Sequence, residues 1–204
     1  MVSKKSRHRD PLVVRTPEGL YCPKAQAHID PWRPVDCALI THAHADHARA
    51  GSKDYHCALG GEGLLKQRLG DQQITTHAYG ESFTRGGVRI SFHPAGHVLG
   101  SAQIRLDDGD SVWVITGDYK RDPDPTCKAF EPVSCDILIT ELRTDELDGV
   151  SLIRELRSTY GEQFPIFAVS RPFPKDRYEA LDAGATAFLN KPLQMRTLFN
   201  TLLI

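Results

Sequence analysis

The residues most able to do chemistry lie in one hexapeptide, His-Ala-His-Ala-Asp-His, which begins at His42. It follows an apolar run over 38–41 that is typical of a buried strand. No helix places side chains at positions i, i+2, i+4 and i+5 on one face, whereas a loop leaving the end of a strand can. Alternate positions would direct His42 and His44 to one cation, and Asp46 and His47 to another. Imidazole and carboxylate ligands together suit zinc or a similar divalent ion.

Three further polar side chains come just beyond the end of an apolar run: His97, Asp118 and Glu141. In layered α/β folds, sites are built at the edge where strands end. Taken alone, His97 could be a glycine-flanked surface histidine and Asp118 an acid in a turn. Together with the hexapeptide, they predict one site at the edge of a sheet.

We therefore predict a centre with two divalent ions, most simply Zn²⁺, with Mn²⁺ as the alternative. Its six ligands are His42, His44 and His97 for the first ion, Asp46 and His47 for the second, and Asp118 as the bridge between them. The catalytic carboxylates would be Asp46 and Asp118. Water between the ions, with its pKa lowered by them, would be the nucleophile, and both ions would stabilise charge on the scissile group.

The composition limits the classes of protein that the chain can belong to. With 204 residues, 40% hydrophobic and 25% charged, it could form one large globular domain or two small ones. A net charge of −1 excludes a global basic field for non-specific binding of nucleic acid. Residues 1–10 predict a basic flexible tail without the apolar core of a signal peptide, and no run approaches membrane-spanning length. Five scattered cysteines indicate reduced thiols, so we expect a cytoplasmic protein.

The elements that would position the site follow from periodicity. We predict a hairpin over 12–22 and strands over 27–30, 38–41, 88–92, 103–106, 111–116 and 137–140. A helix over 61–69 would end at Gly70. Asp30 would either cap a turn or orient a histidine ligand. His56 and His77 stand among polar neighbours and are expected to be exposed structural histidines.

The hexapeptide after a strand resembles the signature of the metallo-β-lactamase fold. Four other segments resemble the bacterial ligase-associated DNA exonucleases, in the β-CASP branch of that fold: 16–23, 29–36, 95–102 and 117–120. The likeness covers about 11–141. It implies metal-dependent hydrolysis of DNA from an end, in DNA repair, with DNA and a DNA ligase as partners. It also implies supporting roles for Asp30, as the first acidic motif of the branch, and for Glu141, as the first acidic motif of the β-CASP insert.

The resemblance to the exonucleases ends after Glu141. That family continues with a DNA-clamping domain and with further histidines, one of which closes the second metal site. No histidine follows His97 in this sequence. The second ion would have only Asp46, His47 and the shared Asp118, so we expect weakened activity.

Residues from about 134 to 204 resemble the C-terminal half of a response-regulator receiver domain. The sequence predicts helices and strands in alternation: helix 148–157, strand 166–170, helix 177–183, strand 187–189 and helix 194–203. Glu141 would stand at the phospho-acceptor position, Ser170 at the switch hydroxyl and Lys191 in the lysine-proline motif. Phosphorylation is not expected, because glutamate replaces aspartate and the acidic pair that binds magnesium is missing.

We thus predict an α/β fold in two parts. Residues 11–140 would form a partial metallo-β-lactamase αββα sandwich, and residues 141–204 a receiver-like, flavodoxin-like βαβαβα half. The predicted function is that of a metal-dependent hydrolase resembling a DNA exonuclease. The alternatives are a non-enzymatic receiver-like signalling or interaction module, a metallo-hydrolase acting on a small molecule, and an inert chimera.

Overall fold

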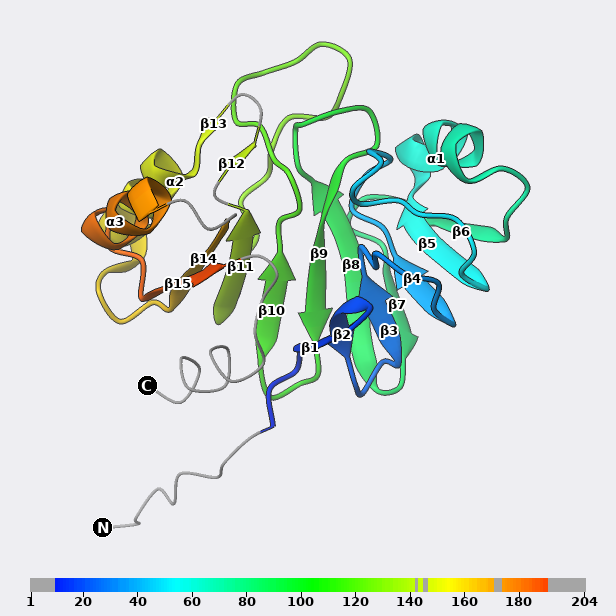
Figure 1. Ribbon diagram of the computed structural model, residues 1–204, viewed down its shortest axis with the longest axis horizontal. Helices are drawn as coiled ribbons and strands as arrows, with labels where there is room; N and C mark the ends of the chain where they lie inside the picture. The colour runs from blue at the N-terminus through cyan, green and yellow to red at the C-terminus, as the bar shows by residue number, and fades with distance from the viewer. Residues whose placement is uncertain (1–9, 142, 145–146, 171–173, 191–204) are drawn as a thin grey trace.

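The computed structural model describes residues 10–141, 143–144, 147–170 and 174–190. Its strands form two sheets that face each other, with helices on the outer sides (Figure 1). The first sheet, in spatial order, contains β1 (Val14–Thr16), β2 (Gly19–Cys22), β3 (Ala27–Ile29), β4 (Cys37–Leu39), β5 (Asp54–Ala58) and β6 (Ile74–His77). Strands β1 to β3 pair antiparallel, and β3 to β6 pair parallel.

The second sheet contains strands from both predicted parts of the chain. In spatial order they are β15 (Ala187–Asn190), β14 (Ile166–Ser170), β11 (Ile137–Glu141), β10 (Val112–Ile115), β9 (Ala102–Asp107), β8 (Val88–Pro94) and β7 (Ser82–Arg85). Strands β7 to β10 are antiparallel, whereas β10, β11, β14 and β15 are parallel. Consequently β8, β10 and β11 all end at the upper edge in Figure 1.

The helices in the described residues are short. They are the 3₁₀ turn Leu59–Gly61, α1 (Glu62–Leu69), α2 (Gly149–Tyr160) and α3 (Pro174–Asp182). Figure 1 shows α1 beside β5 and β6, while α2 and α3 lie beside β14 and β15. A small hairpin of β12 (Arg143–Thr144) and β13 (Leu147–Asp148) precedes α2. Among the described residues, no helix is both long enough and apolar enough to cross a membrane.

Three apolar clusters hold the layers together. The largest lies between the sheets and joins residues such as Leu39 of the first sheet to Phe92 and Ile104 of the second. A second packs Leu65 of α1 against the outer side of the first sheet. A third packs Ile153 of α2 against the outer side of the second. The predicted αββα layering is therefore confirmed.

The receiver-like segment extends the hydrolase-like sheet. Strand β11 pairs with β10 on one side and with β14 on the other, so that Ile139 stands opposite both Ile115 and Phe167. Phe167 and Val169 of β14 are buried in the cluster between the sheets. The predicted boundary at 140/141 thus falls at the end of a strand in the middle of one sheet.

The sequence did not predict β5, β6 or β7. The expectation that His56 and His77 are exposed is wrong, because both are buried, with 8% and 7% of their surface accessible. Both rings stack on Phe83 of β7, a partner that local polarity does not reveal. Residues 1–9 of the tail predicted over 1–10, and the predicted helix over 194–203, lie outside the described residues.

Candidate metal centre

The hexapeptide begins three residues beyond β4, and Asp30 fixes its start. The Asp30 backbone has a φ of 43°, in the left-handed region. Its carboxylate accepts hydrogen bonds from the backbone nitrogen of Thr41 at 2.8 Å and from the Thr41 hydroxyl at 2.6 Å. The same carboxylate lies 2.8 Å from Nδ1 of His47. Asp30 therefore positions both the residue before the hexapeptide and its last histidine.

Four of the predicted ligands converge on one point. One ligand atom from each of His42, His44, His97 and Asp118 lies within 4.8 Å of all the others. Nε2 of His97 is 3.3 Å from Nδ1 of His44. Oδ2 of Asp118 lies 3.8 Å from Nε2 of His42 and 3.8 Å from Nε2 of His97. These distances allow a single cation between the four atoms.

The other carboxylate oxygen of Asp118 faces the remaining histidine. Oδ1 of Asp118 is 3.5 Å from Nε2 of His47. That same ring nitrogen is 3.7 Å from Oδ2 of Asp46, whose side chain is largely exposed. Asp118 therefore stands between two ligand groups, with one oxygen toward each. This is the arrangement that a carboxylate bridging two cations requires.

The donor set fits divalent cations. Nε2 of His42 is buried and has no hydrogen-bond partner among the described residues, an arrangement that is costly unless another group binds that atom. Burial, and then the neighbouring His47, His97 and His44, lower the pKa of His42, so its ring is neutral and keeps a lone pair for a metal. His42 thus has the protonation state that a metal ligand needs.

His47 has the opposite electrostatic environment. Burial lowers its pKa, but the carboxylates of Asp30, Asp118 and Asp46 outweigh that effect and raise the pKa to about 9. Without a cation, a proton on His47 therefore offsets the surrounding negative charge. A metal ion among the same carboxylates would supply that positive charge instead.

Two glycines allow the strand ends to come together. Gly96 has a φ of 74°, and a Cβ there would lie 2.1 Å from the carbonyl oxygen of Lys120. Gly117 has a φ of 57°, and a Cβ there would lie 2.7 Å from the Thr41 side chain. Only glycine fits these close approaches without displacing a neighbour.

The structure brings all six predicted ligands, together with Asp30, to one edge of the sandwich. Of the other predicted residues, some lie elsewhere in the fold and some lie outside the described residues. Glu141 ends β11, but its side chain is not among those described, and Lys191 lies outside the described residues. Ser170 is buried at the end of β14, where its hydroxyl donates to Oδ2 of Asp176 at 2.8 Å. That hydroxyl is therefore engaged inside the fold.

Two hydroxyl groups that support the site were not predicted from the sequence. Besides donating to Asp30, the Thr41 hydroxyl lies 3.1 Å from Nδ1 of His42. The Ser101 hydroxyl accepts from the backbone nitrogens of His97 and Val98, at 3.1 and 3.2 Å. The available signal was a small hydroxyl residue close in sequence to each ligand: Thr41 directly before His42, and Ser101 four residues after His97.

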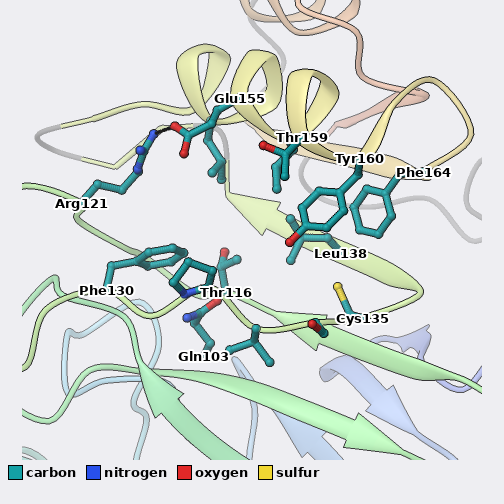
Figure 2. A pocket seen from close by; sticks show the side chains of 15 residues that line it. Gln103, Thr116, Arg121, Phe130, Cys135, Leu138, Glu155, Thr159, Tyr160 and Phe164 are labelled. Carbon is teal, nitrogen blue, oxygen red and sulfur yellow. Dashed lines mark ion pairs between the residues drawn. The ribbon is translucent and has the colours of Figure 1, made fainter.

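A separate cavity of about 570 Å³ lies between the second sheet and α2 (Figure 2). Its lining includes Phe130, Leu138 and Phe164, and none of the six predicted ligands borders it. An ion pair between Arg121 and Glu155 lies at one end in Figure 2. The cavity shows that α2 covers this sheet incompletely.

Comparison with known proteins gives two kinds of match. The family model for the response regulator receiver domain matches residues 120–203. A "Probable DNA ligase" of Opitutus terrae is 32% identical over 54% of this chain, and "Endoribonuclease ysh-1" of Neurospora crassa is 33% identical over 55%. This chain spans 11% of the length of each of these two relatives.

The solved structures include the metallo-β-lactamase fold protein YhfI from Bacillus subtilis. It is 13% identical, with a TM-score of 0.53, over 84% of this chain and 85% of that protein. This likeness shows the fold alone. Both resemblances predicted from the sequence are confirmed: the metallo-β-lactamase fold with nuclease relatives, and the receiver domain.

Proposed function

We propose that this chain is a hydrolase that cleaves phosphodiesters in DNA from an end, with two divalent ions at the candidate metal centre. The observation that carries the proposal is the position of Asp118, whose two oxygens face separate histidine groups. Related endoribonuclease and DNA ligase sequences support a phosphodiester substrate. The DNA ligase relative also supports a role for this chain alongside the joining of DNA strands, as in DNA repair.

The first ion would be held by His42, His44 and His97, and the second by Asp46 and His47. Asp118 would contribute one oxygen to each. When bound, the ions would lower the pKa of an attacking water and stabilise charge on the scissile phosphate. Zn²⁺ suits the nitrogen and oxygen donors, and Mn²⁺ is the alternative.

The remaining residues of the site hold the ligands in place. Asp30 accepts the Nδ1 proton of His47 and so directs the opposite nitrogen, Nε2, toward Asp118. Ser101 fixes the backbone of His97. Asp46, the most exposed ligand, borders solvent, where a DNA end would approach.

We expect the activity to be weak. In this chain the second ion has three side-chain ligands, one of them shared, so its affinity should be lower than that of the first. A net charge of −1 also provides little general attraction for DNA. Productive cleavage would therefore need high metal concentration and low salt.

Metal content and end-dependent cleavage test the proposal together. The purified protein should retain metal at this centre and release nucleotides from linear DNA, but not from a closed circle of the same sequence. His97→Ala should lose metal and cleavage. His28→Ala, which removes a histidine that lies within hydrogen-bond distance of Thr16 and is none of the six ligands, serves as the control. Equal metal content and equal cleavage in His97→Ala and the unaltered protein would refute the proposal.

A further inference from the structure

A second group of metal-binding side chains lies on β4 and β5, outside the candidate metal centre. One ligand atom from each of Cys37, Asp54 and His56 lies within 4.8 Å of the other two. Cys37 and Asp54 are directly opposite each other in the parallel register, and His56 is two residues beyond Asp54. Side chains alternate along a strand, so all three project from the same face of the sheet.

The imidazole of His56 is held in a fixed orientation. Its Nε2 is 3.0 Å from Oδ2 of Asp54, and its Nδ1 is 2.9 Å from Nε2 of His77. Phe83 of β7 stacks on both rings, with centroids 5.0 Å from that of His56 and 4.0 Å from that of His77. The donors are therefore set before any ion arrives, which reduces the entropy cost of binding.

We propose that Cys37, Asp54 and His56 form a second cation site that takes Zn²⁺. A thiolate, a carboxylate and an imidazole are the three ligand types that zinc uses, and water would complete a tetrahedron. The ring of His77 would accept the Nδ1 proton of His56 from outside, as the outer partners of zinc-bound histidines do. The site uses none of the six ligands of the candidate metal centre. A test of this site is therefore independent of the proposed function.

Burial and charge define the conditions for binding. Cys37 is buried, and burial raises the pKa of its thiol to about 11. Binding would therefore form the Zn–S bond and release the thiol proton to water. The carboxylate of Asp54 is partly exposed and provides a route inward. Nη1 of Arg85 lies 4.0 Å from Oδ2 of Asp54, and its Nε donates to the carbonyl oxygen of Ala25, so a positive charge stands beside the site.

Cobalt is the most direct probe, because Co²⁺ bound to a thiolate gives a near-ultraviolet charge-transfer band. None of the ligands of the candidate metal centre contains sulfur, so the band reports only on a cysteine site. Titration of the full chain with Co²⁺ should produce the band, and Zn²⁺ should displace it. Cys37→Ser should abolish it. His97→Ala should leave it unchanged, which separates this site from the metal centre.

Cys57→Ala is the matched control, since Cys57 is a buried neighbour of His56 that packs in the cluster beneath α1. This variant should keep the band. If Cys37→Ser fails to fold, Asp54→Asn tests the site instead, because Asp54 is partly exposed. The affinity of the Asp54→Asn variant for Co²⁺ should fall roughly tenfold or more. Absence of the band in the unaltered protein, or its persistence in folded Cys37→Ser, would overturn the proposal, as would an unchanged affinity in Asp54→Asn.

Discussion

Nδ1 of His47 lies 2.8 Å from Oδ2 of Asp30, and this contact links the stability of the fold to pH. Two more carboxylates, Asp118 and Asp46, lie near the opposite ring nitrogen. In the metal-free protein, His47 therefore binds a proton more tightly when the chain is folded than when it is unfolded. Protonation of His47 and folding are linked.

We predict that the metal-free protein loses stability as pH rises from about 6.5 to about 9. The folded-state pKa of His47 is raised to about 9 from 6.5. The contribution of His47 to stability is complete below the lower pKa and disappears above the higher one, a change of roughly 3 kcal/mol. Urea unfolding with a chelator present, repeated across this range, measures it. Asp30→Asn should flatten the dependence; a variant with the same pH profile as the unaltered protein would contradict this account.

Gly117→Ala should damage the metal centre through Thr41. The new Cβ would come within 2.7 Å of Thr41, whose hydroxyl donates to Asp30. We expect a loss of about 3 kcal/mol in unfolding free energy and a clear loss of bound metal. Gly109→Ala is the control, since its φ is also positive, at 84°, but nothing lies within 4 Å of the new Cβ. It should cost about 1 kcal/mol and leave metal content intact. Equal effects in the two variants would show that backbone strain alone is responsible.

Phe167→Ala tests whether β14 belongs to the common core. Phe167 is buried between the two sheets, opposite Ile139 in the register. Removing the ring should lower the free energy of unfolding by roughly 3–5 kcal/mol. Both parts of the chain should then unfold together, in one transition at a lower temperature. Thermal unfolding followed by circular dichroism and by metal release checks this. Two separate transitions, with metal release unaffected by the substitution, would show that the parts fold independently.

The sequence predicted the convergence of the candidate ligands better than the sheet around them. Local patterns identified the hexapeptide, His97 and Asp118, because each follows an apolar run that reads as a strand. The same criterion failed for β5, where Asp54 and His56 stand among buried neighbours and interrupt the apolar pattern. The burial of His56 depends on Phe83, a residue remote in sequence that the pattern around His56 does not specify.

The pairing of β11 with β14 could not be predicted either. Periodicity identified both strands, but it does not specify which strand lies beside which. The apolar residues of β11 suit either family, and only the three-dimensional register shows that one strand joins the two parts. The sequence therefore predicted these two strands while leaving open how the receiver-like segment packs.

Among the positively charged side chains, Arg157 of α2 should contribute most to the packing of the receiver-like segment. Its guanidinium donates to the carbonyl oxygens of Gly161, Phe164 and Gly184, and to the hydroxyl of Thr186. These bonds tie the end of α2 to the loop before β14 and to the turn before β15. Arg157→Ala would leave several of these carbonyl groups with fewer partners, and we expect a loss of about 2–4 kcal/mol.

Arg154→Ala is the matched control on the same helix. Within the described part of the chain, Arg154 makes only a long, exposed ion pair with Asp182, at 3.9 Å, so its removal should cost less than about 0.5 kcal/mol. Arg157→Lys should lose nearly as much as Arg157→Ala, because an ammonium group cannot reach acceptors on three sides at once. Equilibrium unfolding in urea ranks the three variants. If Arg157→Ala and Arg154→Ala prove equally stable, these hydrogen bonds do not hold the receiver-like segment against the sandwich.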